Sequence, residues 1–177
     1  PEDVRRAMLK FKPTIVHFCG HGAQDGGIAF EDDTGCSLIV TPEALSGFFK
    51  LFADQVECVV LNACYSDSQA DAIGEHIEHV VGMHGGVDDE KAIMFSVAFY
   101  DALGAGKDVK FAYELALNAT EWDQNGDTLT PILKSAATSP SVDEPNIVRE
   151  NTEKLRRNLT SALSAFKGQP EVFVEPV

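Results

Sequence analysis

PTIVHFCGHG, residues Pro13 to Gly22, is an apolar run that ends in a histidine between two glycines. Its β-branched and aromatic residues predict a buried strand from Thr14 to Cys19. Alternate residues of a strand share one face, so His17, Cys19 and His21 would point the same way. The pattern therefore allows either a metal-binding stripe or a strand that delivers one histidine to an active site.

Two further apolar runs follow the same plan. ECVVLNAC, Glu57 to Cys64, predicts a buried strand before a helix that Ser66 or Ser68 caps. EHVVGMHG, Glu78 to Gly85, precedes a segment with helical spacing that stops at Gly104. Apolar strands that alternate with helices indicate a mostly parallel sheet covered on both faces, so the predicted fold class is α/β.

The remaining segments fit around this sheet. We expect a helix at Val4–Phe11, a hairpin at Ile28–Val40, a helix from Pro42 to about Phe52, a helix at Val109–Thr120 and a short strand at Thr130–Leu133. Residues 1–177 are predicted to form a single domain, with a mobile polar loop at 135–146 and a C-terminal helix and edge strand at 147–177. Because the first residue is a proline, we expect the sequence to be the C-terminal part of a longer protein.

The composition excludes several classes of partner. The 177 residues are 44% hydrophobic, which is enough to bury one sizeable core. Fourteen Lys and Arg against 28 Asp and Glu give a net charge of -14 without any basic run, so we expect neither nucleic acid nor a membrane surface as a partner. The four cysteines form no C-x-x-C pair and no signal-peptide pattern is present, which predicts a cytoplasmic protein.

His21 and Cys64 are the candidates for chemistry because each follows a predicted strand. Ligand sites in parallel sheets lie beyond the carboxyl ends of the strands. Backbone N–H groups at the start of the next helix stabilise a thiolate at Cys64, and Gly20 and Gly22 leave the His21 imidazole uncrowded. An imidazole that accepts the thiol proton, with the N–H groups of Gly22 and Cys64 as oxyanion donors, is the machinery of a cysteine protease.

The metal interpretation of the same strand is weaker. A zinc site needs three or four ligands in tetrahedral geometry, and positions on one strand face supply only part of that set even with His84 added. The apolar neighbours of His17 and Cys19 favour them as core residues instead. We therefore expect no metal and no cofactor.

Several ordered motifs together resemble one family. HFCGHG, VVLNACYS, VVGM and AIMFSVAFYDALGAGKDVKFAYELA, spread over Thr14 to Ala119, resemble the CHAT family of caspase-like proteins. The resemblance implies a caspase-like α/β/α sandwich and a cysteine endopeptidase in which His21 and Cys64 form the catalytic dyad and Gly22 contributes to the oxyanion site. It also implies a protein or peptide substrate and an upstream regulatory domain or partner protein, as in bacterial signalling or defence. The first sheet strand of similar proteins, which should precede the helix that ends near Phe11, is missing from this sequence.

The position two residues before the cysteine bears on specificity. In similar proteins that cut after Arg or Lys this residue is often acidic, whereas here it is Asn62, which weakens a strictly basic preference. Asp25, Asp33 and Asp88 surround the expected cleft in sequence and are, with Asn62, the candidates for substrate binding. A solvated loop carboxylate is the alternative for each aspartate.

A second class of function also fits the pattern. A fold does not dictate an activity, so the chain could be a catalytically silent caspase-like module that binds protein partners. The presence of both dyad residues favours the enzyme.

Overall fold

A computed structural model describes residues 2–23, 27–31, 36–122 and 129–135. The predicted loop at 135–146, apart from Ser135, and the predicted C-terminal helix and strand at 147–177 lie outside the described residues.

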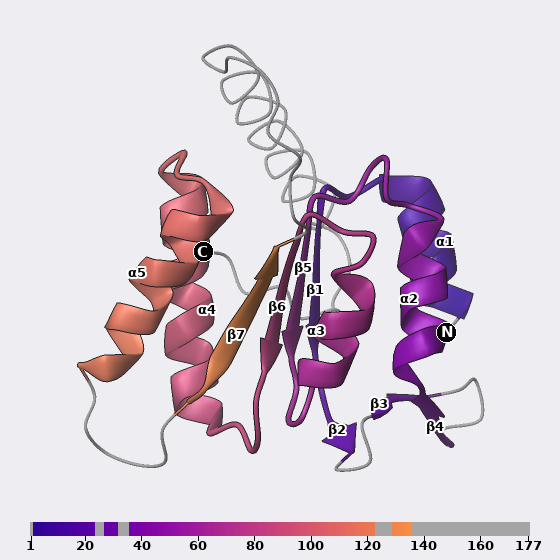
Figure 1. Cartoon of the computed structure of the whole chain (residues 1–177), viewed down its shortest axis with the longest axis horizontal. Helices are drawn as coiled ribbons and strands as arrows, with labels where there is room; N and C mark the ends of the chain where they lie inside the picture. The colour runs from indigo at the N-terminus through magenta and orange to yellow at the C-terminus, as the bar shows by residue number, and fades with distance from the viewer. Residues whose placement is uncertain (1, 24–26, 32–35, 123–128, 136–177) are drawn as a thin grey trace, which may run out of the picture.

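The central sheet has four strands in the order β1-β5-β6-β7 (Figure 1). β1 (Ile15–Cys19), β5 (Cys58–Asn62) and β6 (His79–Met83) are parallel, and β7 (Pro131–Ser135) runs antiparallel to β6. The connections from β1 to β5 and from β5 to β6 contain helices, as parallel neighbours require. The α/β class with a mostly parallel sheet is confirmed.

Helices cover both faces of this sheet (Figure 1). α1 (Glu2–Phe11), α2 (Pro42–Lys50) and α3 (Asp67–Ile73) lie on one side, and α4 (Asp89–Gly104) and α5 (Val109–Glu121) lie on the other. The arrangement is therefore an α/β/α sandwich. None of the helices in the described ranges is long and apolar enough to cross a membrane.

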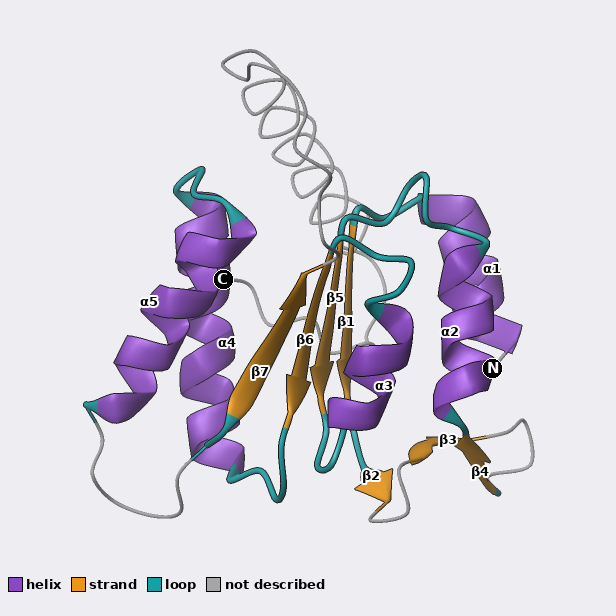
Figure 2. Cartoon of the chain, in the orientation of Figure 1, coloured by secondary structure: helices purple, strands orange, loops and turns teal. Residues whose placement is uncertain are grey.

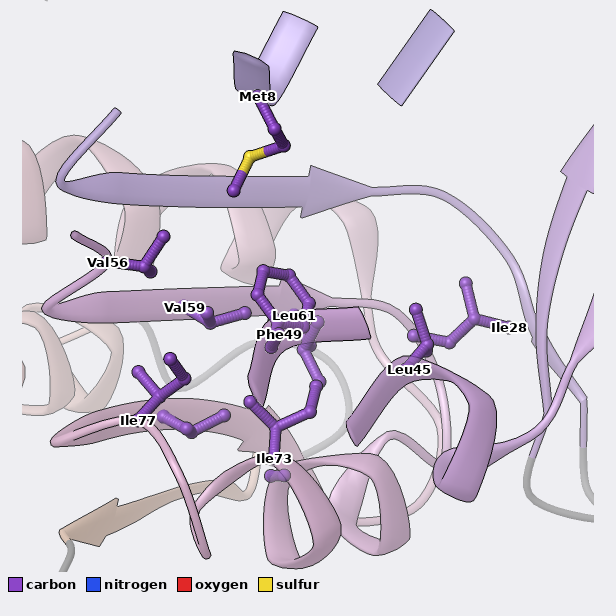
Figure 3. Close-up of a cluster of buried hydrophobic side chains, with 11 residues drawn as sticks. Met8, Ile28, Leu45, Phe49, Val56, Val59, Leu61, Ile73 and Ile77 are labelled. Carbon is purple, nitrogen blue, oxygen red and sulfur yellow. The ribbon is translucent and has the colours of Figure 1, made fainter. Parts of the chain in front are cut away.

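The strand period of two divides the core into two clusters. In β5, Val59 and Leu61 face α1, α2 and α3, whereas Cys58 and Val60 face α4 and α5. All five residues of β5 are buried because the strand lies inside the sheet and is covered on both faces. Figure 3 shows the first cluster, which includes Met8, Ile28, Leu45, Phe49, Val59, Leu61, Ile73 and Ile77.

A second, antiparallel sheet lies beyond the carboxyl end of β1 (Figure 2). It consists of β2 (Gly22–Ala23), β3 (Gly27–Glu31) and β4 (Ser37–Val40), in that order. The predicted hairpin between residues 28 and 40 is confirmed. Gly22, the first residue of β2, follows His21 directly, so this small sheet holds the chain just after the candidate histidine.

The start of α2 follows the predicted capping chemistry. Pro42 is the first helical residue, and the Thr41 hydroxyl accepts a hydrogen bond from the Ala44 N–H at 3.3 Å. The helix ends at Lys50, two residues before the predicted end at Phe52.

The prediction that His17 and Cys19 lie in the core is wrong, because neither belongs to a buried cluster: Cys19 is exposed, and His17 keeps part of its surface exposed, although its neighbours desolvate the imidazole enough to lower its pKa to about 4. Among the described residues β1 is an edge strand of the sheet, and its five residues are only half-buried or exposed, whereas all five of β5 are buried. His17 stacks on Tyr100 of α4 with ring centroids 5.6 Å apart. β1 is thus apolar in sequence but only partly covered in the fold.

An apolar groove of about 310 Å³ lies beside this edge. Side chains of α1, β1, β3, β4 and α2 line it, together with Leu61 of β5. His21 and Cys64 are not among its described lining residues, so the groove is separate from the candidate dyad.

Candidate active site

The register of β1 against β5 places the candidate histidine and cysteine at the same end of the sheet. Cys19 pairs with Asn62, and the Gly20 N–H donates to the Asn62 carbonyl at 3.3 Å. His21 lies two residues beyond Cys19, and Cys64 lies two residues beyond Asn62. The segments that follow β1 and β5 therefore leave the sheet side by side at the same edge, which is the position expected from the sequence.

Gly22 lies directly against the backbone of Cys64. A Cβ atom on Gly22 would overlap the Cys64 carbonyl oxygen and would lie 2.8 Å from its carbonyl carbon. Side chains do not tolerate such contacts with backbone atoms, so only glycine fits at this position. The residue after His21 is thus packed on the candidate nucleophile, while the His21 carbonyl accepts a hydrogen bond from the Ala29 N–H at 2.9 Å.

The chain turns sharply after Cys64. Tyr65 has a φ of 54°, in the left-handed region that non-glycine residues rarely occupy. Its N–H donates to the Gly85 carbonyl at 2.8 Å, and the Ser66 N–H donates to the Met83 carbonyl at 2.9 Å. These bonds to the end of β6 compensate the strain, which is typical of functional turns.

Cys64 is the best placed of the cysteines for nucleophilic chemistry. It is half-buried, and its sulfur accepts a hydrogen bond from the Val87 N–H at 3.3 Å. Burial, with a contribution from the neighbouring Glu57 carboxylate, raises the pKa of the Cys58 thiol to about 12, so Cys58 stays protonated at neutral pH.

Ser66 is a structural residue of the site whose role the sequence did not reveal. The β5–β6 ladder ends at the pair Val60–Val81, where the two strands separate. Beyond this pair, the Ser66 hydroxyl donates to the Leu61 carbonyl at 3.0 Å and accepts from the Met83 N–H at 2.9 Å. It occupies the N-cap position of α3, one of the two positions predicted (Ser66 or Ser68), but its hydroxyl bridges the strands and makes no cap bond, so the predicted side-chain cap does not form at Ser66.

Ser66→Ala is expected to lower the free energy of unfolding by about 2 kcal/mol, because it leaves a buried carbonyl and a buried N–H without partners. Urea denaturation measures this change. Ser68→Ala is the matched control, because Ser68 is exposed and, within the described part of the chain, its hydroxyl bonds the Gln69 side chain alone, at 3.2 Å. Equal losses in the two variants would contradict the bridging role of Ser66.

Asn62 is buried under α4, with 8% of its surface exposed. Its Nδ2 donates to the Ser96 hydroxyl at 3.3 Å and lies 3.5 Å from the Ala92 carbonyl. The Ser96 hydroxyl itself donates to the Ala92 carbonyl at 2.9 Å, so it can only accept from Asn62, which fixes the orientation of the amide. The Asn62 Oδ1 has no hydrogen-bond partner among the described residues.

The three predicted aspartates differ in what the structure describes. Asp88 is exposed, and its Oδ1 caps α4 by accepting from the Lys91 N–H at 3.0 Å. Asp25 and Asp33 lie outside the described residues. Substrate contact by any of the three stays a prediction.

No group of three or more His, Cys, Asp or Glu side chains in the described part of the chain is arranged to hold a metal ion. His84, the suggested fourth ligand of a stripe on β1, instead lies 2.6 Å from the Asp67 carboxylate, measured from Nδ1 to Oδ2.

A mostly parallel sheet between two layers of helices, with a histidine after one strand and a cysteine after the adjacent strand, defines a caspase-like α/β/α domain. Within that class, the chain belongs to the CHAT domain family, which matches residues 1–125.

Two curated relatives are named as proteases. A Roc-COR-CHAT protease from an unknown prokaryotic organism is 27% identical over 124 residues, which cover 67% of this chain and 12% of the relative. A probable protease from Gillisia limnaea is 25% identical over 126 residues, which cover 69% of this chain and 22% of the relative. The chain thus spans less than a quarter of the length of either protein.

Proposed function

We propose that this domain is a cysteine endopeptidase that cleaves a protein substrate with Cys64 as nucleophile and His21 as general base. The observation that carries the proposal is the contact of Gly22 with the Cys64 backbone, because it fixes the residue next to His21 against the cysteine. Membership of the CHAT family and two relatives named as proteases support the same reaction class.

The proposed reaction has two stages. The His21 imidazole takes the Cys64 proton, and the sulfur attacks the substrate carbonyl carbon to form a tetrahedral intermediate. The N–H groups of Gly22 and Cys64 are the proposed donors to its oxyanion. The C–N bond then breaks as the imidazolium gives its proton to the leaving amine. Water, deprotonated by His21, hydrolyses the resulting thioester and restores the thiol.

We propose that Asn62 contributes to substrate selection. A buried acceptor without a partner is costly, and a hydrogen bond from a substrate side chain would remove that cost. Asn62 lies two residues before Cys64, and its Oδ1 is shielded from solvent in this structure, so a substrate N–H or O–H donor would reach it only if the covering side chains move aside.

Asn62→Asp is expected to shift cleavage toward sites that follow Arg or Lys by about tenfold, because a carboxylate binds a cation more strongly than an amide does. Site preference is measured on a mixed peptide library. Ser96→Ala is the control, because it removes the contact with α4 but keeps the Asn62 acceptor. A library profile unchanged by Asn62→Asp would contradict the role in selection.

We also propose that other parts of a longer protein control this domain. One relative carries the name Roc-COR-CHAT, and both are several times longer than the region that matches. The apolar groove beside the edge strand β1 is the proposed contact, since an added strand would pair with β1 while its side chains fill the groove.

The test of the proposed function is a proteome-wide search for new protein N-termini. Cells that express the full-length protein are compared with cells that express its Cys64→Ala variant. New N-termini that depend on Cys64 are expected, and their flanking sequences give the specificity. Identical N-termini in both samples, with both proteins folded and expressed, would favour the catalytically silent interaction module instead.

A further inference from the structure

The loop of residues 84–87, between β6 and α4, is bonded to the turn that carries the candidate nucleophile. The Gly85 carbonyl accepts from the Tyr65 N–H at 2.8 Å, and the Val87 N–H donates to the Cys64 sulfur at 3.3 Å. The first bond holds the strained residue after the cysteine, and the second holds the sulfur itself. The position of this loop therefore determines the surroundings of Cys64.

A side-chain pair closes this loop onto α3. The His84 Nδ1 lies 2.6 Å from the Asp67 Oδ2, while the other carboxylate oxygen accepts from the Ser68 N–H at 3.0 Å. Partial burial acts to raise the pKa of Asp67, but the hydrogen bonds from His84 and Ser68 outweigh it and lower that pKa. Asp67 is therefore ionised at neutral pH, and both of its oxygens are engaged.

The pair ties together the two segments on either side of the sulfur. Asp67 lies three residues after Cys64, and His84 lies three residues before Val87. At the start of the loop, the His84 N–H is also fixed, by a bond of 2.8 Å to the Thr130 carbonyl. Between His84 and Val87 lie only Gly85, which has a φ of 80°, and Gly86. Glycine has little conformational preference of its own, so the contacts at the two ends of the loop must determine the conformation of the loop.

We propose that His84 and Asp67 are positioning residues that hold the 84–87 loop so that the Val87 N–H reaches the Cys64 sulfur. This inference rests on the proposed function, in which that sulfur is the nucleophile. An N–H donor stabilises a thiolate, and a small displacement of a nucleophile costs much of the rate. Neither residue touches the substrate in this role, and both act through Val87.

The test uses the full-length protein and iodoacetamide as a probe of the sulfur. Site-resolved mass spectrometry follows alkylation of Cys64 at pH 7.5 in the wild type and in the His84→Ala, His84→Gln and Asp67→Ala variants. Alkylation is expected to be about three- to tenfold slower in both Ala variants, since each loses the loop contact. His84→Gln keeps an N–H donor for Asp67 and is expected to restore most of the rate.

Asp71→Ala is the matched control. Asp71 lies on α3 as Asp67 does, and its carboxylate pairs with Lys134 at 2.6 Å, but this pair joins α3 to β7. The alkylation rate of Cys64 is expected to remain unchanged in Asp71→Ala. Thermal melting of each variant then separates a general loss of stability from a local effect on the sulfur.

Cleavage kinetics give the second measurement, with a peptide that spans a site found in the N-terminal search. Both Ala variants are expected to lower kcat about 10- to 100-fold and to leave KM within about twofold. Unchanged alkylation in His84→Ala, or equal losses in His84→Ala and His84→Gln, would overturn the inference. If the wild type cleaves nothing, the proposed function fails, but the alkylation rates still decide whether the pair positions Cys64.

Discussion

Cys64→Ala is expected to abolish peptide-bond cleavage, and His21→Ala is expected to lower kcat by at least about 10⁴-fold. The first variant lacks the proposed nucleophile, the sulfur that would form the covalent bond to the substrate. The second lacks the proposed general base, the imidazole that would remove the thiol proton and later protonate the leaving amine. The measurement is single-turnover cleavage of the peptide found in the N-terminal search.

Cys19→Ala is the control for this prediction. Cys19 is an exposed thiol at the end of β1, two residues before His21, and it has no role in the proposed reaction. We expect Cys19→Ala to keep full activity. We also expect all three variants to melt within a few degrees of the wild type, because substitutions of residues that are at least partly exposed change stability little. Undiminished cleavage in Cys64→Ala or His21→Ala would end the dyad assignment.

The placement of the candidate dyad was predictable because it depends on strand order alone. An apolar run ends before His21, another ends before Cys64, and parallel strands present their carboxyl ends at the same edge of the sheet. The helices and strands within the described residues were predictable for a related reason. Each shows an uninterrupted pattern of apolar residues at helical or strand spacing. These features need no knowledge of which side chains meet.

The burial of β1 was not predictable because it depends on the neighbours of the strand. His17 and Cys19 lie in an apolar run as Val59 and Leu61 do, yet β1 is at an edge of the sheet and β5 is inside it. Periodicity reports which residues share a face, but it does not report what covers that face. The error therefore arose at the level of tertiary packing.

The contacts that shape the site also lie beyond sequence reasoning. Ser66 bridges the ends of two strands only because β5 and β6 separate after Val60 and Val81. His84 meets Asp67 across 17 residues of sequence, and both residue types are common at exposed positions. A sequence alone gives such residues no distinguishing pattern.

Gly22→Ala is expected to damage both stability and activity, by about 3 kcal/mol in the free energy of unfolding and more than about 100-fold in kcat. The added Cβ would overlap the Cys64 carbonyl oxygen, so β2 or the turn at Cys64 must move. Movement of β2 displaces His21, and movement of the turn displaces the sulfur. Either shift changes the position of His21 relative to Cys64, the proposed base and nucleophile. Urea denaturation and single-turnover cleavage measure the two losses.

Gly47→Ala separates this steric effect from the general effect of replacing a glycine. Gly47 is an exposed residue inside α2, and a Cβ there meets no atom within 4 Å. Alanine is favoured over glycine within a helix by about 0.5–1 kcal/mol, so this variant is expected to be slightly more stable than the wild type and fully active. Gly22→Ala with wild-type stability and activity would show that β2 and the Cys64 turn can separate freely. The contact between Gly22 and Cys64 could then not be what positions His21 relative to Cys64, and the main support for the proposed dyad would be lost.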